Sequence, residues 1–198
     1  LHLSIRRQRQ MCIRDRDSRI SMKGIGVNKT RSGIIRILEM MNAKISVTNI
    51  RMCGGEKVAD ITVASSDLHG VEIPLDCVAA AIDEFPAIFI AAACAKGVTV
   101  LRGATELRHK ESDRIEVMAS GLRTLGVDLE TYEDGIKIVG GCIGPGTVDA
   151  QGDHRVAMAF SIAALKASGN IDISNAEGIS TSFPEFVSIA KSVGLRVE

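Results

Sequence analysis

Three amphipathic segments that end in the same way constrain the fold of this chain more than any other feature. They read GIIRILEMMNAKI, IEVMASGLRTLGVDL and FPEFVSIAKSVGLRVE, with apolar residues three and four positions apart. Each pattern predicts a helix that ends in a turn, at Asn42, Gly126 or Gly194, and then enters a strand. Such a recurrence indicates an internal structural repeat.

The segments between these helices predict the rest of the repeating unit. Runs typical of strands are ISVTNI, VADITVAS, LETYEDGIKIVGG, TVDAQ and NIDISNAEG, and Asp134-Gly135 predicts a hairpin turn. The segments AIFIAAACAKG and VAMAFSIAALKA lack a polar face, so we expect buried helices. The predicted unit is therefore β-α-β-α-β-β, with an incomplete first copy and two fuller copies that begin near His69 and Cys142. Because such units must stack to bury their apolar faces, the expected fold class is α/β (α+β).

Composition excludes several classes of protein. The net charge is zero, the aromatic content is 3% and tryptophan is absent, so we expect no nucleic-acid partner. No apolar run reaches the length of a membrane span, so no membrane partner is expected. The five cysteines are odd in number and widely spaced, which is typical of reduced thiols in a cytoplasmic protein. We also expect no metal site and no secretory signal.

Residues 106–114, ELRHKESDR, form the densest cluster of chemically capable side chains. They follow a strand-like run and precede a helical pattern, for which Ser112 is the expected N-cap. Helix N-termini bind anions through free N–H groups, and guanidinium groups bind carboxylates and phosphates in a bidentate manner. A solvated, salt-bridged turn is the alternative interpretation for a charge run of this kind.

Two further clusters also open apolar helices. Asp153, His154 and Arg155 precede VAMAFSIAALKA, and Asp83 and Glu84 precede AIFIAAACAKG. Each cluster on its own is consistent with ordinary helix capping. Because the same arrangement occurs three times, we favour a functional role for the set.

These motifs carry a family resemblance. IDEFP, AAACAKG, ELRHKESDRI, GDHRVAMA and STSFPEF occur in this order and resemble the C-terminal half of enolpyruvyl transferases of the EPSP synthase (3-phosphoshikimate 1-carboxyvinyltransferase) family. The resemblance covers residues 19 to 198 and implies an inside-out α/β barrel-type domain. We therefore expect residues 17–198 to be one enolpyruvyl transferase domain, with the other domain of the enzyme missing. Residues 1–16 are expected to be a non-native or disordered tail, because the composition changes abruptly near Asp17.

The resemblance also implies a reaction and its residues. The carboxyvinyl group of phosphoenolpyruvate is transferred to the 5-hydroxyl of shikimate 3-phosphate, phosphate is released, and no cofactor is required. Asp83 matches the family carboxylate at the substrate hydroxyl and is the expected base, and Glu111 is the expected proton donor. The residues that match substrate-binding positions are Lys110, Arg114, His154 and Arg155, together with Asp83. Asp113 and Asp153 are expected to orient the arginines, and the site residues to converge on one electropositive wall.

The resemblance implies further properties and leaves two alternatives. We expect the chain to be a fragment that is inactive alone, and the whole enzyme to be a cytoplasmic monomer with glyphosate as a candidate inhibitor. One alternative is a non-catalytic half-domain that binds anions. The other is the sister enzyme that acts on UDP-N-acetylglucosamine, which shares the fold but has other motifs at the positions of KESDR and DHR.

Overall fold

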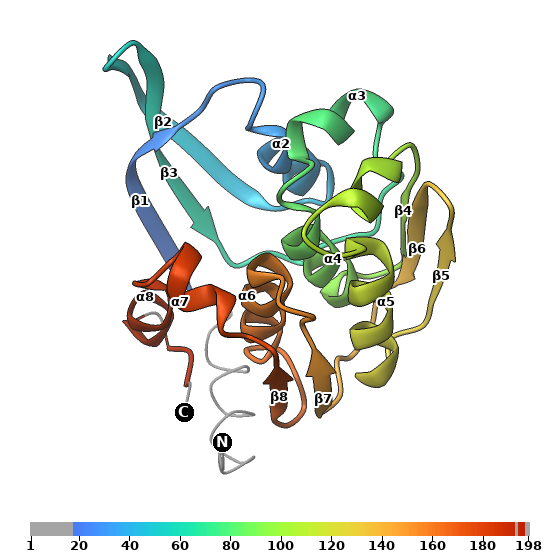
Figure 1. Cartoon of the computed structure of the whole chain (residues 1–198). Coiled ribbons are helices and arrows are strands. Elements are labelled where there is room, and N and C mark those ends of the chain that lie inside the picture. Colours follow the sequence, from blue (N-terminus) through green and yellow to red (C-terminus); the bar gives the residue numbers. More distant parts are fainter. Residues whose placement is uncertain (1–17, 193, 197–198) are drawn as a thin grey trace.

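The computed structural model describes residues 18–192 and 194–196, and the predicted tail, residues 1–16, lies outside them. Figure 1 shows the β1–β3–β2 sheet on one side, the β4–β6–β5 sheet on the other and the β7–β8 pair below, with α4 and α6 between them. The helices α4 and α6 therefore lie inside and the strands outside, as expected for an inside-out α/β fold.

The elements follow the predicted repeat. The first unit contains β1 (Arg19–Gly26), α2 (Gly33–Met40), β2 (Lys44–Cys53) and β3 (Glu56–Ala64). The second contains α3 (Leu75–Val78), η2 (Ala79–Ala81), α4 (Phe85–Cys94), β4 (Val98–Leu101), η3 (Thr105–His109), α5 (Arg114–Thr124), β5 (Leu129–Tyr132) and β6 (Gly135–Val139). The third contains β7 (Gly146–Asp149), α6 (His154–Ala163), β8 (Ile171–Ser174), α7 (Gly178–Ser182) and α8 (Phe186–Ser192).

Strand pairing confirms the repeat for two units and corrects it for the third. The sheets β1–β3–β2 and β4–β6–β5 are both antiparallel and have the same order. The segment from His69 to Glu72 takes the place of the first strand of the second unit. It forms parallel bridges to Lys96 and Val100. The third unit has the corresponding parallel pair, β7 and β8. However, the residues described after α8 form no strand, so the third copy is less complete than predicted.

The three amphipathic helices end in the same kind of turn. Asn42, Gly126 and Gly194 have positive φ angles of 71°, 81° and 102°. The next residue in each case donates its N–H to a carbonyl in the last turn, with distances of 2.8, 3.0 and 2.9 Å for Ala43, Val127 and Leu195. This is the Schellman arrangement, and it confirms the three predicted turns.

The buried helices place the starts of α5 and α6 near each other. Phe85, Ile88 and Phe89 of α4 are buried, as predicted for an apolar helix, and α4 packs against α6. Gly121 of α5 faces Phe160 of α6, and a Cβ at this glycine would lie 2.3 Å from the ring. The small residue therefore allows the two helices to approach closely.

Gly135 has a different role from the one that the sequence predicts. Tyr132 pairs with Gly135, so the hairpin turn consists of Glu133 and Asp134, one residue earlier than the predicted Asp134-Gly135 turn. A Cβ at Gly135 would lie only 1.9 Å from the carbonyl oxygen of Leu101. The glycine therefore permits the close approach of β6 to the end of β4.

Gly135→Ala is expected to lower the free energy of unfolding by about 1–3 kcal/mol, because the added methyl group forces the backbone apart. Urea denaturation of the chain measures this change. Gly141→Ala is the matched control, since a Cβ at Gly141 meets nothing within 4 Å. Equal stability of the two variants would contradict the close-packing role.

Candidate active site

Arg114 is the centre of the candidate site. It is the first residue of α5, it follows the N-cap residue Asp113, and its side chain is fully buried. Its Nε donates to Asp153 Oδ2 at 2.8 Å, and its Nη2 donates to Glu111 Oε2 at 2.5 Å. Its Nη1 lies 3.5 Å from Asp83 Oδ1. One guanidinium thus joins all three charged clusters, from α4, α5 and α6.

Asp153 holds this arginine from the start of α6. Its Oδ1 accepts from the backbone N–H groups of Arg155 and Val156 at 2.9 and 3.4 Å, which caps the helix. Its Oδ2 accepts from Arg114 and from the Ser112 hydroxyl. Burial raises the pKa of Asp153, but the hydrogen bond and charge of Arg114 and the backbone donors outweigh it, so this pKa lies below its usual value. The fully buried carboxylate therefore stays ionised.

Asp83 and Arg155 form the second contact between clusters. Arg155 Nη1 donates to the Asp83 carbonyl oxygen at 3.0 Å, and its Nη2 lies 3.7 Å from Asp83 Oδ2. Asp83 and Glu111 are each about half exposed, at 48% and 51%, whereas Arg114 beneath them is fully buried. Both carboxylates are therefore open to a molecule that approaches from solvent.

The Nη1 group of Arg114 is a buried donor without a hydrogen-bond partner among the described residues. The Asp83 carboxylate, at 3.5 Å, forms an ion pair with this group but no hydrogen bond. A buried guanidinium N–H normally has an acceptor. If its hydrogen bond is not formed, the free energy lost on removing the charged group from water is not recovered. An anionic oxygen within hydrogen-bond distance of Nη1 would satisfy this donor.

Two predicted site residues lie outside this network. Lys110 forms an ion pair with Glu106, on the preceding turn of η3. His154 is half-buried at the start of α6, and its Cβ faces Gly178 of α7. In the described part of the chain, the ion pairs of Arg114 and Arg155 do not include either residue.

The ion-pair network around Arg114 does not have the excess of positive charge that the predicted electropositive wall requires. The network contains two arginines, Arg114 and Arg155, and three carboxylates, at Asp83, Glu111 and Asp153. Burial raises the pKa of the neighbouring Glu84, and the attraction of Arg155 opposes this shift. The carboxylates offset the arginine charges, because a buried guanidinium requires ionic partners.

Arg108 is a positioning residue that sequence reasoning missed. Its Nη1 donates to Asp113 Oδ2 at 2.7 Å, and its Nε and Nη2 donate to the carbonyl oxygens of Glu133 and Tyr132. Asp113 in turn accepts from the Glu116 N–H and is the N-cap of α5, a role that we predicted for Ser112. Arg108 therefore links residues 106–114 to the β5–β6 hairpin by hydrogen bonds. The prediction that Asp113 orients Arg114 or Arg155 is wrong, whereas Asp153 does contact Arg114.

Other classes of site find no support in the described residues. Within 18–192 and 194–196, no group of His, Cys, Asp and Glu side chains has an arrangement that could hold a metal ion. None of the helices described is long and apolar enough to cross a membrane. The described cysteines, Cys53, Cys77, Cys94 and Cys142, are free thiols.

Comparison with known proteins identifies the family. The profile of EPSP synthase (3-phosphoshikimate 1-carboxyvinyltransferase) matches residues 13–189. A 3-phosphoshikimate 1-carboxyvinyltransferase from Acidithiobacillus ferrooxidans is 54% identical over 181 residues, which are 91% of this chain and 42% of that protein. One from Methylococcus capsulatus is 52% identical, over 91% of this chain and 41% of that protein.

Solved structures agree with these relatives. An EPSP synthase from Acinetobacter baumannii has a TM-score of 0.90 and 48% identity, over 92% of this chain and 43% of that one. The enolpyruvyl transferase NikO from Streptomyces tendae has a TM-score of 0.67 at 20% identity, over 98% of this chain and 43% of that one, and it supports the fold alone. The chain thus spans about two fifths of the length of its relatives, and it belongs to the EPSP synthase family.

Proposed function

We propose that this chain forms one wall of the active site of an EPSP synthase. The complete enzyme would add the 5-hydroxyl oxygen of shikimate 3-phosphate to C2 of phosphoenolpyruvate while a proton is added to C3. The tetrahedral intermediate would then lose the C3 proton and phosphate to give the enol ether. The observation that carries the proposal is the buried Nη1 of Arg114, which has no hydrogen-bond acceptor among the described residues, on a guanidinium that contacts the half-exposed carboxylates of Asp83 and Glu111.

The geometry supports a division of roles among these residues. Asp83 is the proposed base for the substrate hydroxyl, and Glu111 is the proposed donor of the C3 proton; the same groups can reverse their roles when phosphate leaves. Arg114 and Arg155 would bind the carboxylate and phosphate of phosphoenolpyruvate. Lys110 and His154 keep their predicted substrate-binding roles in this proposal, and Lys110 would have to leave Glu106 to reach a substrate.

The charge balance of the network implies that this wall does not act alone. Two anionic substrates that approach each other repel by about 1–4 kcal/mol per close charge pair, depending on the dielectric. The carboxylates of Asp83, Glu111 and Asp153 already offset the charges of Arg114 and Arg155. We infer that additional cations come from the part of the relatives that this chain does not span.

The chain alone is expected to release no phosphate from phosphoenolpyruvate and shikimate 3-phosphate. When it replaces the matching part of the Acidithiobacillus ferrooxidans relative, the chimera is expected to release phosphate with both substrates together. A coupled phosphate assay measures both. An inactive chimera that folds would contradict the proposed function, and turnover by the chain alone would contradict the need for a second wall.

Arg155→Ala in that chimera is expected to raise the KM for phosphoenolpyruvate more than the KM for shikimate 3-phosphate. The reason is that Arg155 is the more exposed of the two arginines, with 36% of its side chain accessible to a ligand. Steady-state kinetics with each substrate varied in turn measures the two constants, with Arg36→Ala, on an exposed surface pair, as the control. A larger change for shikimate 3-phosphate would contradict the assignment.

The remaining properties of the whole enzyme are also proposals. Free thiols at all four described cysteines favour a reducing compartment, which is consistent with the cytoplasm. We infer that the enzyme is a monomer, that glyphosate is a candidate inhibitor and that residues 17–198 form one domain of it. A non-catalytic half-domain would use the same Arg114 donor, and it would bind phosphate in the chimera without turnover.

A further inference from the structure

The turn before α2 corresponds, in the repeat, to the turn before α5. In both units a strand leads through a turn into an amphipathic helix, and the sheets β1–β3–β2 and β4–β6–β5 have the same order. The first-unit turn, residues 27–32, therefore takes the place that residues 102–113 have in the second unit. The latter segment carries Lys110 and Glu111 of the candidate site. The first-unit turn reads VNKTRS and contains two cations.

Helix packing brings the first-unit turn close to Asp83. Gly33, the first residue of α2, is buried, and a Cβ added to it would lie 2.7 Å from the backbone carbonyl carbon of Ala80. The helix α2 packs against η2 and α3, and Figure 1 shows it beside α3. Asp83 follows η2 by only two residues, and the turn directly precedes Gly33. The first-unit turn therefore lies near the proposed base.

The first-unit turn presents its two cations to solvent. The Thr30 N–H donates to Asn28 Oδ1 at 3.2 Å, and the Arg31 N–H donates to the Asn28 carbonyl oxygen at 2.9 Å, which shapes the turn. Lys29 and Arg31 are both exposed. Among the residues that the structure describes, neither forms an ion pair, whereas both arginines of the network around Asp83 do. These two positive charges are therefore not offset in the way that the charges of the network are.

Glu84 shows that the charge of Arg31 reaches the candidate site. Glu84 is the N-cap residue of α4 and directly follows Asp83. Burial raises the pKa of the Glu84 carboxyl, and the positive charges of Arg155 and, more weakly, of Arg31 oppose this shift. Arg155 also contacts Asp83. Arg31 therefore belongs to the same electrostatic environment as the ion-pair network.

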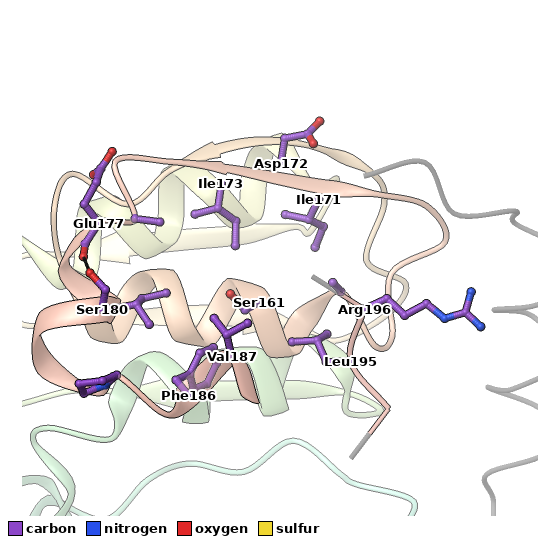
Figure 2. Close-up of a pocket in the computed structure, with 14 residues that line it drawn as sticks. Ser161, Ile171, Asp172, Ile173, Glu177, Ser180, Phe186, Val187, Leu195 and Arg196 are labelled. Atoms are coloured by element: carbon purple, nitrogen blue, oxygen red, sulfur yellow. Dashed lines mark hydrogen bonds between the residues drawn. The ribbon is translucent and has the colours of Figure 1, made fainter. Parts of the chain in front are cut away.

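The third unit has no comparable pair of cations. Residues 175–185, which lead from β8 to α8, contain no lysine or arginine. A hollow of about 490 Å³ lies beside them. Figure 2 shows Ile171, Ile173 and Val187 around this hollow, with the Arg196 side chain extending away from it. An apolar hollow of this kind does not suit an anion, so the first-unit turn is the better candidate for a further anion contact.

We propose that Arg31 is a further substrate-binding residue, which contacts a phosphate or carboxylate group of the two anionic substrates near Arg155. This assignment rests on the proposed function. Two anions that approach each other repel, and the arginines of the network are already offset by three carboxylates. An exposed guanidinium without an ion pair among the described residues can bind an anionic group in a bidentate manner. Lys29 adds positive potential to the same turn. Arg31 would thus supply one of the additional cations from within this chain.

Arg31→Gln in the chimera with the Acidithiobacillus ferrooxidans relative tests this role. The KM for at least one substrate is expected to rise about three- to tenfold, since a contact to a charged group is lost at an exposed site. A rise for phosphoenolpyruvate alone assigns the contact to that substrate, and a rise for shikimate 3-phosphate alone assigns it to the acceptor. The kcat is expected to stay within about twofold, because Arg31 is not assigned a proton-transfer step. Arg31→Lys, which keeps the charge, is expected to recover part of the loss.

Arg36→Gln is the matched control, because Arg36 lies on α2 and pairs with Asp76 on an exposed surface. It is expected to change neither KM by more than about twofold. The rise of KM with added potassium chloride should also be shallower for Arg31→Gln than for the unsubstituted chimera. Unchanged KM values for Arg31→Gln, or equal effects of the two variants, would overturn this assignment. So would a KM change accompanied by a lower urea midpoint, which indicates a structural role. An inactive chimera contradicts the proposed function, whereas an active chimera insensitive to Arg31→Gln contradicts only the role of Arg31.

Discussion

Replacing Arg114 by alanine is expected to lower the free energy of unfolding by about 3–5 kcal/mol, the usual cost of breaking a buried ion pair. The guanidinium is fully buried and is the charged partner of Asp153, which is also fully buried. Its removal leaves the Asp153 carboxylate, among the residues that the structure describes, with only the Ser112 hydroxyl and the helix-capping N–H groups as donors. Urea denaturation of the chain, followed by circular dichroism, measures the change.

Two further variants test whether the loss of stability is specific to the buried ion pair of Arg114. Arg123→Ala lies on the same helix and breaks an exposed pair with Glu116, so it is expected to cost about 0.2–1 kcal/mol. The double variant with Arg114→Met and Asp153→Asn removes both charges and is expected to be more stable than Arg114→Ala. Losses of similar size for Arg114→Ala and Arg123→Ala would show that Arg114 is not the structural centre of the three clusters.

Asp83→Asn in the active chimera is expected to lower kcat by about 10²–10⁴, the range for loss of a general base. The amide keeps the size of the side chain but cannot accept a proton. The side chain is half exposed, and its weaker contacts to Arg114 and Arg155 are 3.5 and 3.7 Å long, so the effect on stability should be small. Steady-state phosphate release measures kcat and both KM values.

Asp76→Asn is the matched control for this change. Asp76 lies in the first turn of α3, and it pairs with Arg36 on an exposed surface away from the site. Its substitution is expected to leave kcat unchanged within about twofold, since exposed pairs contribute little. A kcat for Asp83→Asn close to that of the unsubstituted chimera would remove the proposed base.

Local sequence signals were sufficient for most of the fold. The turns at Asn42, Gly126 and Gly194 could be predicted because a positive φ angle and the end of an apolar helical pattern are both local properties. The buried helices α4 and α6 could be predicted because they lack a polar face. The N-cap of α5 was misplaced by one residue, since Ser112 and Asp113 are both good caps and the hydroxyl of Ser112 contacts Asp153 instead.

The site could be predicted as a set of residues but not as a network. The motifs identified Asp83, Glu111, Arg114 and Arg155, and the structure brings these four together. Asp153 contacts Arg114, which is 39 positions away in the sequence. This contact depends on how α5 packs against α6, so no local sequence pattern predicts it. The contact between Lys110 and Glu106 is a local one at helical spacing, and the charge run alone could have indicated it.

The most direct measurement is a crystal structure of the chimera with phosphoenolpyruvate and shikimate 3-phosphate bound. We expect a carboxylate or phosphate oxygen of phosphoenolpyruvate within hydrogen-bond distance of Arg114 Nη1, and the 5-hydroxyl of the acceptor within hydrogen-bond distance of Asp83. Substrates bound at another place, with Arg114 Nη1 still lacking an acceptor, would contradict the assignment of this wall to the reaction.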